Sequence, residues 1–135
     1  MTHLVADFNC SGVISTQNTY ENITLTPSTT TLGSDKLEVD ENNNLIFKKK
    51  GIYLISANVQ YTGNGSGNRY LRLANTNGNN PVDILTISSY KQANANCNIT
   101  LIRTVAIPDD NYSVALQMYG DANDQIAKGN SGIIY

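Results

Sequence analysis

The strongest constraint on the fold of this chain is a central stretch, residues 53–61, in which two kinds of side chain alternate strictly. One set of alternate positions is aromatic or aliphatic and holds Tyr53, Ile55, Ala57, Val59 and Tyr61. The other set carries no charge and holds Leu54, Ser56, Asn58 and Gln60. A period of two is the signature of a β-strand with one face in a core. The second face tolerates water, and it also tolerates burial against another subunit if its polar groups are hydrogen-bonded.

Shorter alternating segments recur along the chain, separated by segments rich in Asn, Gly, Ser and Pro, which favour turns. Candidate strands cover residues 3–10, 18–25, 69–76, 82–90, 97–107, 112–119 and 131–135, and two more flank a turn at 42–44. Candidate loops cover residues 63–68, 77–81, 91–96, 108–111 and 120–130. No ten-residue window has the uninterrupted apolar spacing of an amphipathic helix. The sequence therefore predicts one domain over residues 1–135, an all-β antiparallel jelly-roll sandwich of about ten strands without a long helix.

Charge and hydropathy exclude several classes of partner. The formal net charge is −2 and nine residues are basic, so the chain lacks the positive surface that binds nucleic acid or an anionic membrane. No apolar stretch approaches the roughly 20 residues that a membrane span requires, which predicts no membrane insertion. The first twelve residues do not resemble a secretory signal, so synthesis in the cytoplasm without export is expected unless an upstream region is missing. Two buried thiols at Cys10 and Cys97 are therefore favoured over a disulfide.

The residues that catalysis requires are few. His3 is the single histidine, so no Ser-His-Asp or Cys-His arrangement can be built around a well-positioned base. The Cys and His residues are also too few and too widely separated for a zinc site. The Gly-rich segment 63–67 lacks the Lys and the following helix of a phosphate-binding loop, which favours a flexible hairpin tip. The chain is therefore expected not to be an enzyme and to need no cofactor, with calcium as the one ion to consider.

Two sets of polar residues are candidates for ligand binding. Asp121, Asn123 and Asp124 offer closely spaced oxygen ligands for Ca²⁺, with a plain polar loop as the alternative because the Gly and distant Glu of a helix–loop–helix calcium site are missing. A saccharide requires aromatic rings that stack on the sugar and amides that read its hydroxyls. The candidates for such a site are Tyr61, Tyr70, Tyr90, Asn64, Asn68, Asn77, Asn79 and Asn80. The alternative for each tyrosine is packing in the core or at an interface.

Residues 51–63 resemble the Gly-x-Tyr strand of the jelly-roll domains shared by complement-type globular heads and tumour-necrosis-factor-like (TNF-like) proteins, with Leu45 at the apolar position six residues before the glycine. Residues 112–121 are similar to the next-to-last strand of these domains, and residues 131–135 to the closing strand. The resemblance extends over residues 45–135. The chain departs from complement-type heads at Ile55 and Ala57, where those heads usually have aromatic residues, and it contains no Trp.

The resemblance implies a ten-stranded sandwich that packs around a threefold axis through the sheet holding the central and the closing strand. By position in the family pattern, the trimer interface would contain Leu54, Ser56, Asn58 and Ile134. The core of the sandwich would contain Tyr53, Ile55, Val59 and Ile133. A monomer whose second face is simply hydrated is the alternative.

The first functional hypothesis is a trimeric binding head of a bacteriophage or bacterial surface structure, located on a virion or a cell-surface appendage. Such a head recognises a host saccharide or surface protein, and its three copies offset a weak affinity at each site. The first alternative is a structural trimerisation, capping or decoration module without a soluble ligand. The second is a secreted cytokine-like or complement-like ligand of a receptor, which would require export.

Overall fold

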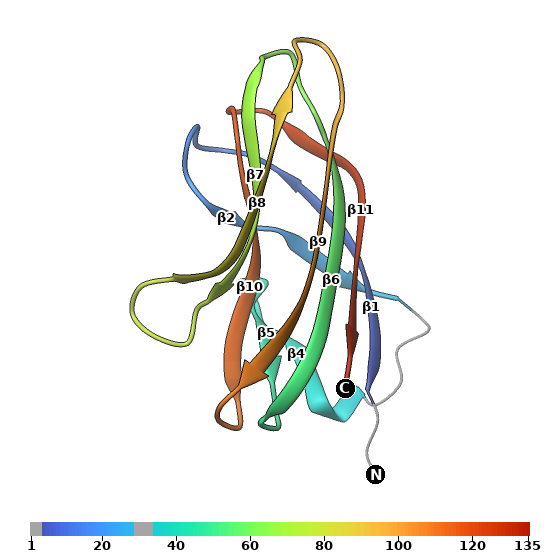
Figure 1. Cartoon of the computed structure of the whole chain (residues 1–135), viewed down its shortest axis with the longest axis vertical. Helices are drawn as coiled ribbons and strands as arrows, with labels where there is room; N and C mark the ends of the chain where they lie inside the picture. Colours follow the sequence, from blue (N-terminus) through green and yellow to red (C-terminus); the bar gives the residue numbers. More distant parts are fainter. Residues whose placement is uncertain (1–3, 29–33) are drawn as a thin grey trace.

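Two antiparallel β-sheets pack face to face (Figure 1). The computed structural model describes residues 4–28 and 34–135. The first sheet has the strand order β3-β1-β11-β6-β9, and the second has the order β4-β5-β10-β7-β8, with β2 also paired to β10. The strands are β1 (Val5–Val13), β2 (Glu21–Asn22), β3 (Thr24–Pro27), β4 (Leu37–Val39), β5 (Leu45–Phe47), β6 (Gly51–Thr62), β7 (Gly67–Asn75), β8 (Val82–Lys91), β9 (Cys97–Ile107), β10 (Tyr112–Tyr119) and β11 (Gln125–Ile134). A 3₁₀ turn, η1 (Ser34–Lys36), is the one helical element within the described residues, and the predicted all-β jelly-roll sandwich is confirmed.

The two ends of the described chain lie side by side in the first sheet. The backbone N–H of Tyr135 donates to the carbonyl of Leu4 at 3.0 Å, and the N–H of Leu4 donates back to the carbonyl of Tyr135 at 3.4 Å. Both ends lie at the bottom of Figure 1. Among the residues that the structure describes, no helix has both the length and the apolar character needed to cross a membrane.

The segment 18–25, expected to be one strand, contributes to two strands in different sheets. β2 pairs with β10 in the second sheet, whereas β3 pairs with β1 in the first. Ile23 lies between them and is completely buried, and its N–H donates to the carbonyl of Leu116 at 2.9 Å. The chain therefore crosses from one sheet to the other at a buried residue. This crossing helps to explain why the described residues form eleven strands rather than about ten.

The last strand is longer than the sequence predicts. β11 begins at Gln125. The sequence predicts a loop over residues 120–130, because most of them are small or polar, and a strand that begins only at Ser131. A register shift between Ile126 and Lys128 interrupts the alternation. Gly129 follows, and a Cβ added there would lie 2.8 Å from the carbonyl oxygen of Asn58 on β6. The shift and the glycine together conceal the period of two by which a strand is recognised.

β6 divides the core from the outer face of the first sheet. The residues completely buried on the inner side include Tyr53, Ile55, Val59 and Ile133. The ring of Tyr53 packs edge-on against Phe47 with 4.7 Å between ring centroids, and its hydroxyl donates to the carbonyl of Lys49 at 2.5 Å. Tyr53 thus combines a large buried apolar area with a satisfied polar group, the arrangement that makes a buried tyrosine stabilising.

Tyr61 is a core residue, which corrects its assignment as a ligand-binding residue. The side chain is completely buried, and its hydroxyl donates to the carbonyl of Tyr70 at 2.5 Å. Burial raises the pKa of this phenol above its usual value. Tyr61 occupies an inward position of the alternating strand, and the second sheet still covers that face at the end of β6. No part of its ring is therefore left to stack on a sugar.

The two cysteines lie in the core and are not joined. Cys10 on β1 and Cys97 on β9 are both buried and free, and β11 and β6 separate their strands in the first sheet. Burial raises the pKa of the Cys10 thiol to about 12, because the thiolate is costly to form away from water. At neutral pH Cys10 is therefore a protonated, unreactive apolar residue.

Candidate functional site

Three loops meet at the end of the molecule opposite the chain ends. They connect β6 to β7, β8 to β9 and β10 to β11, and they lie in the upper part of Figure 1. Residues 62–65, 94–96 and 121–125 line a cleft of about 540 Å³ between them, termed here the distal cleft. The N–H of Asn94 donates to the carbonyl of Asn64 at 3.1 Å and joins two of the loops. The volume lies within the range of small-molecule sites.

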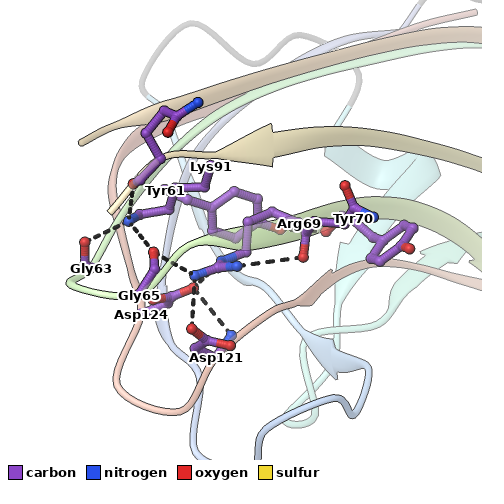
Figure 2. Close-up of polar contacts among 10 residues, drawn as sticks. Tyr61, Gly63, Gly65, Arg69, Tyr70, Lys91, Asp121 and Asp124 are labelled. Atoms are coloured by element: carbon purple, nitrogen blue, oxygen red, sulfur yellow. Dashed lines mark hydrogen bonds and ion pairs between the residues drawn. The ribbon is translucent and has the colours of Figure 1, made fainter. Parts of the chain in front are cut away.

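Arg69 lies beneath the distal cleft and holds two of its loops together (Figure 2). Its side chain points inward from β7 and is 1 % exposed. Nε donates to Asp124 Oδ2 at 2.5 Å, and Nη2 donates to Asp121 Oδ2 at 3.0 Å and to the carbonyl of Gly65 at 3.2 Å. Asp124 is itself buried, so this ion pair is desolvated on both sides. Breaking such a pair leaves an uncompensated buried charge, which is strongly destabilising.

Lys91, the last residue of β8, lies beside Arg69 and is completely buried. Its Nζ donates to the carbonyls of Gly63 at 2.5 Å, Gly65 at 2.8 Å and Gln92 at 3.1 Å. Figure 2 shows the bonds to Gly63 and Gly65. These three bonds use all three protons of the ammonium group. The loop between β6 and β7 is thus held by two buried cations through its carbonyls, which corrects the expectation of a flexible hairpin tip.

Glycine is required in this loop by close packing. A Cβ added to Gly63 would collide with Asp124 Oδ1, and one added to Gly65 would collide with Asp121 Oδ2. The glycines allow the loop backbone to lie against the carboxylates, and its carbonyls to reach Lys91 and Arg69. Gly63 and Gly65 of the sequence GNGSG therefore allow the backbone to pack closely against the charged side chains.

The residues expected to bind calcium are not arranged as a ligand set. Asp121 and Asp124 direct carboxylate oxygens at the guanidinium of Arg69, which occupies the place a cation would take. Asn123 lines the distal cleft instead. Across residues 4–28 and 34–135, no group of three or more His, Cys, Asp and Glu side chains is positioned to hold a metal ion. The two carboxylates balance the two buried cations, so the cluster is electrically neutral.

The eight saccharide candidates do not form one site. Asn64 lines the distal cleft and Tyr61 lies in the core. Asn68, Tyr70 and Tyr90 lie on the outer face of the second sheet. There, Tyr70 packs edge-on against Tyr119 with 5.0 Å between centroids, whereas Tyr90 is 57 % exposed. The third group, Asn77, Asn79 and Asn80, lies in the loop between β7 and β8.

Sequence reasoning did not identify several residues that build the distal cleft. Asn94, Asn96 and Gln125 line it, and Arg69 and Lys91 support it from below. Asn94 and Asn96 lie in a loop and Gln125 is the first residue of β11, so none of the three belongs to a periodic pattern that could give a signal. Arg69 did give one, because it shares the inward parity of Leu71 and Leu73 on β7, and a charge at an inward position indicates a buried ionic partner.

The outer face of the first sheet carries a group of exposed apolar side chains, termed here the apolar patch. Its members are Val5, Ile52, Leu54, Ile102 and Ile134, each 38 % to 64 % exposed. Leu54 lies directly opposite Ile134, which lies opposite Val5, so three neighbouring strands contribute to one row. Farther along β6, Ser56 Oγ donates to the carbonyl of Gly132 at 3.4 Å, and Asn58 Nδ2 donates to Thr100 Oγ1 at 3.1 Å. The four residues expected at a trimer interface thus share one surface.

No protein-family model matches the chain, and no curated protein matches its sequence. Solved structures do match. Murine APRIL at pH 8.0 superposes with a TM-score of 0.76 at 11 % identity over 98 % of both chains. Eiger TNF from S. frugiperda superposes with a TM-score of 0.71 at 16 % identity, over 99 % of this chain and 92 % of that one. The fold of the protein is therefore a TNF-like jelly roll.

Proposed function

We propose that the protein is a non-enzymatic binding module that assembles as a homotrimer and engages a protein receptor, in the manner of a cytokine-like ligand. The similarity to murine APRIL and to Eiger TNF extends over nearly the whole chain and supports this class of function. Those neighbours favour the cytokine-like alternative over the bacteriophage or bacterial head expected from the sequence. An extracellular location belongs to this proposal.

The observation that carries the proposal is the apolar patch. Monomeric proteins rarely expose contiguous apolar groups of this kind, and those that do use them for association. The patch lies on four neighbouring strands of the first sheet, β1, β11, β6 and β9. Because these strands are regular and hydrogen-bonded to one another, the surface is fixed before a partner arrives. The outward side of β6 has no charge from Ile52 to Gln60, so pairing with identical copies leaves no charge of this strand buried.

Light scattering tests the assembly. The wild-type protein is expected at about three times the chain mass of 14.7 kDa. Leu54→Asp places a charge in the centre of the patch and is expected to yield monomers. Val82→Asp is the matched control, because Val82 is 60 % exposed on the second sheet, and the same change there is expected to leave the trimer intact. A wild-type monomer at every concentration, or equal dissociation by both variants, contradicts the proposal.

Binding to cells tests the receptor. Fluorescently labelled trimer is applied to a panel of animal and bacterial cells, and each cell type is also treated beforehand with protease or with glycosidases. Protease treatment is expected to abolish binding to the responsive cells, and the Leu54→Asp variant is expected to bind more weakly because it loses avidity. Binding that survives protease contradicts a protein receptor. A trimer that binds no cell type supports the structural module instead.

A further inference from the structure

The distal cleft offers hydrogen-bonding groups that the protein itself does not use. Five side-chain amides line it, from Asn64, Asn94, Asn96, Asn123 and Gln125. None of these amides is hydrogen-bonded to another described residue. Each amide provides two donor protons and an acceptor oxygen. We propose that the distal cleft is a binding site for a neutral saccharide, formed within one subunit and separate from the apolar patch.

The chemistry of the lining excludes other classes of ligand. An anion requires an accessible cation, but Arg69 and Lys91 are buried and direct their protons at carbonyls and carboxylates. A metal ion requires free carboxylates, but Asp121 and Asp124 are paired with Arg69. An apolar ligand requires large apolar side chains, and the lining contains none larger than alanine. A neutral molecule with many hydroxyl groups satisfies donors and acceptors at once. The aromatic ring expected from the sequence for a saccharide site is absent from the described residues of this lining, so hydrogen bonds from the amides alone hold the sugar.

The cleft is also held in shape before a ligand binds. Arg69 joins the loop between β10 and β11 to the loop between β6 and β7, and Lys91 joins the latter to the end of β8. The loop between β10 and β11 is further held by Ile14, whose N–H donates to the carbonyl of Asp124 at 2.8 Å. The loop backbone is thus ordered before a ligand binds, so only the exposed amide side chains lose conformational entropy on binding. The expected affinity of one cleft is millimolar, and several copies on one particle raise it by avidity.

The direct test is a titration followed in proton–nitrogen correlation spectra. The probes are glucose, galactose, mannose and N-acetylglucosamine, added separately to the wild-type protein. At least one sugar is expected to shift the amide signals of residues 62–65, 94–96 and 121–125 in a saturable manner, while the apolar patch stays unchanged. Inorganic phosphate is the probe for an anion site, and saturable shifts of the same residues by phosphate but by no sugar overturn the proposal. No shift with any of the four sugars overturns it as well.

Paired variants locate the site. Asn96→Ala with Asn123→Ala removes two unused amides from the cleft and is expected to weaken sugar binding about tenfold, as the loss of two neutral hydrogen bonds does. Asn79→Ala with Asn80→Ala makes the same chemical change in the loop between β7 and β8 and is expected to leave binding unchanged. The opposite pattern, with binding lost in the second pair alone, places the sugar elsewhere and overturns the proposal.

Sugar binding is expected to be independent of trimer formation. The cleft begins at Thr62, at the opposite end of β6 from Leu54, so the Leu54→Asp monomer is expected to bind the sugar with the affinity of the wild type. A wild-type protein that proves monomeric but binds sugar contradicts the proposed trimer and leaves the saccharide site in place. A trimer that binds no sugar supports the proposed trimer and overturns the saccharide site. Sugar binding that disappears in the folded monomer shows that the site lies between subunits, and it overturns the present inference.

Discussion

β6 connects two regions of the molecule that are built in opposite ways. At one end, its outward side chains belong to the apolar patch, which is formed by regular strands without buried charge. At the other end, it leads into the distal cleft, which is polar, formed by loops and supported by Arg69 and Lys91. The first region depends on apolar side chains that its own subunit does not cover. The second depends on buried ion pairs that its own subunit completes. We therefore expect association and ligand binding to respond to different substitutions.

The largest expected effect comes from a substitution on the buried face of β6, and it is compared with one on the outer face. Tyr53→Ala removes a completely buried ring that packs against Phe47, and it should lower the free energy of unfolding by about 3–5 kcal/mol, as large aromatic deletions from cores do. Leu54→Ala, at the next residue, should weaken association and change the fold of the subunit little. Denaturant unfolding and light scattering measure the two quantities. If both variants reduce both quantities equally, the division between the two faces is wrong.

The second substitution tests the support of the distal cleft. Arg69→Met leaves the carboxylate of Asp124 buried without its cation and should cost about 3 kcal/mol of unfolding free energy. Arg103→Met on β9 is the matched control, because Arg103 is exposed and its replacement should change stability by less than about 0.5 kcal/mol. Thermal and denaturant unfolding provide the measurement. An Arg69→Met protein as stable as the control would show that the ion pairs do not support the loops.

A smaller effect is expected from the loop glycines. Gly63→Ala introduces a Cβ that collides with Asp124 Oδ1, and because Arg69 holds that carboxylate the change should destabilise by about 1–3 kcal/mol. Gly78→Ala is the control, since a Cβ there has no atom within 4 Å, and it should leave stability unchanged or slightly increased. Equal melting temperatures for the two variants would mean that the loop moves away from the carboxylate.

The smallest expected effect is a pH dependence of stability that arises from Glu21. Burial alone would raise the pKa of Glu21, but hydrogen bonds from Ser15 and Thr16 hold it below its usual value. A carboxyl whose pKa is lowered by folding stabilises the protein above its unfolded pKa of about 4.3, and this contribution is lost as the pH falls through the folded value. The melting temperature of Glu21→Gln should therefore lie below that of the wild type at pH 7 and approach it in acid. A difference that grows in acid contradicts this sign.

Periodicity made the two faces of β6 predictable, whereas the distal cleft was not. Tyr53 and Leu54 are assigned to opposite faces by alternation alone, since successive side chains of a strand point to opposite sides. The cleft joins loops that are distant in sequence, and no local pattern says that Asp124 meets Arg69. The sequence offered Asp121, Asn123 and Asp124 as candidate oxygen ligands for Ca²⁺, but the two carboxylates pair with the guanidinium of Arg69 from another strand. The loop positions of Asn94 and Asn96 carry no period from which their direction can be inferred.

The backbone pairing of Leu4 with Tyr135 has a practical consequence for engineering. The two residues already exchange hydrogen bonds at the end of the sandwich away from the cleft, so a short linker can join them without bending the first sheet. New ends can then be opened beside Gly78, in the loop where an added Cβ touches nothing. Such a circular permutant keeps β6 continuous and allows a cargo to be attached at a point remote from both surfaces that we expect to bind.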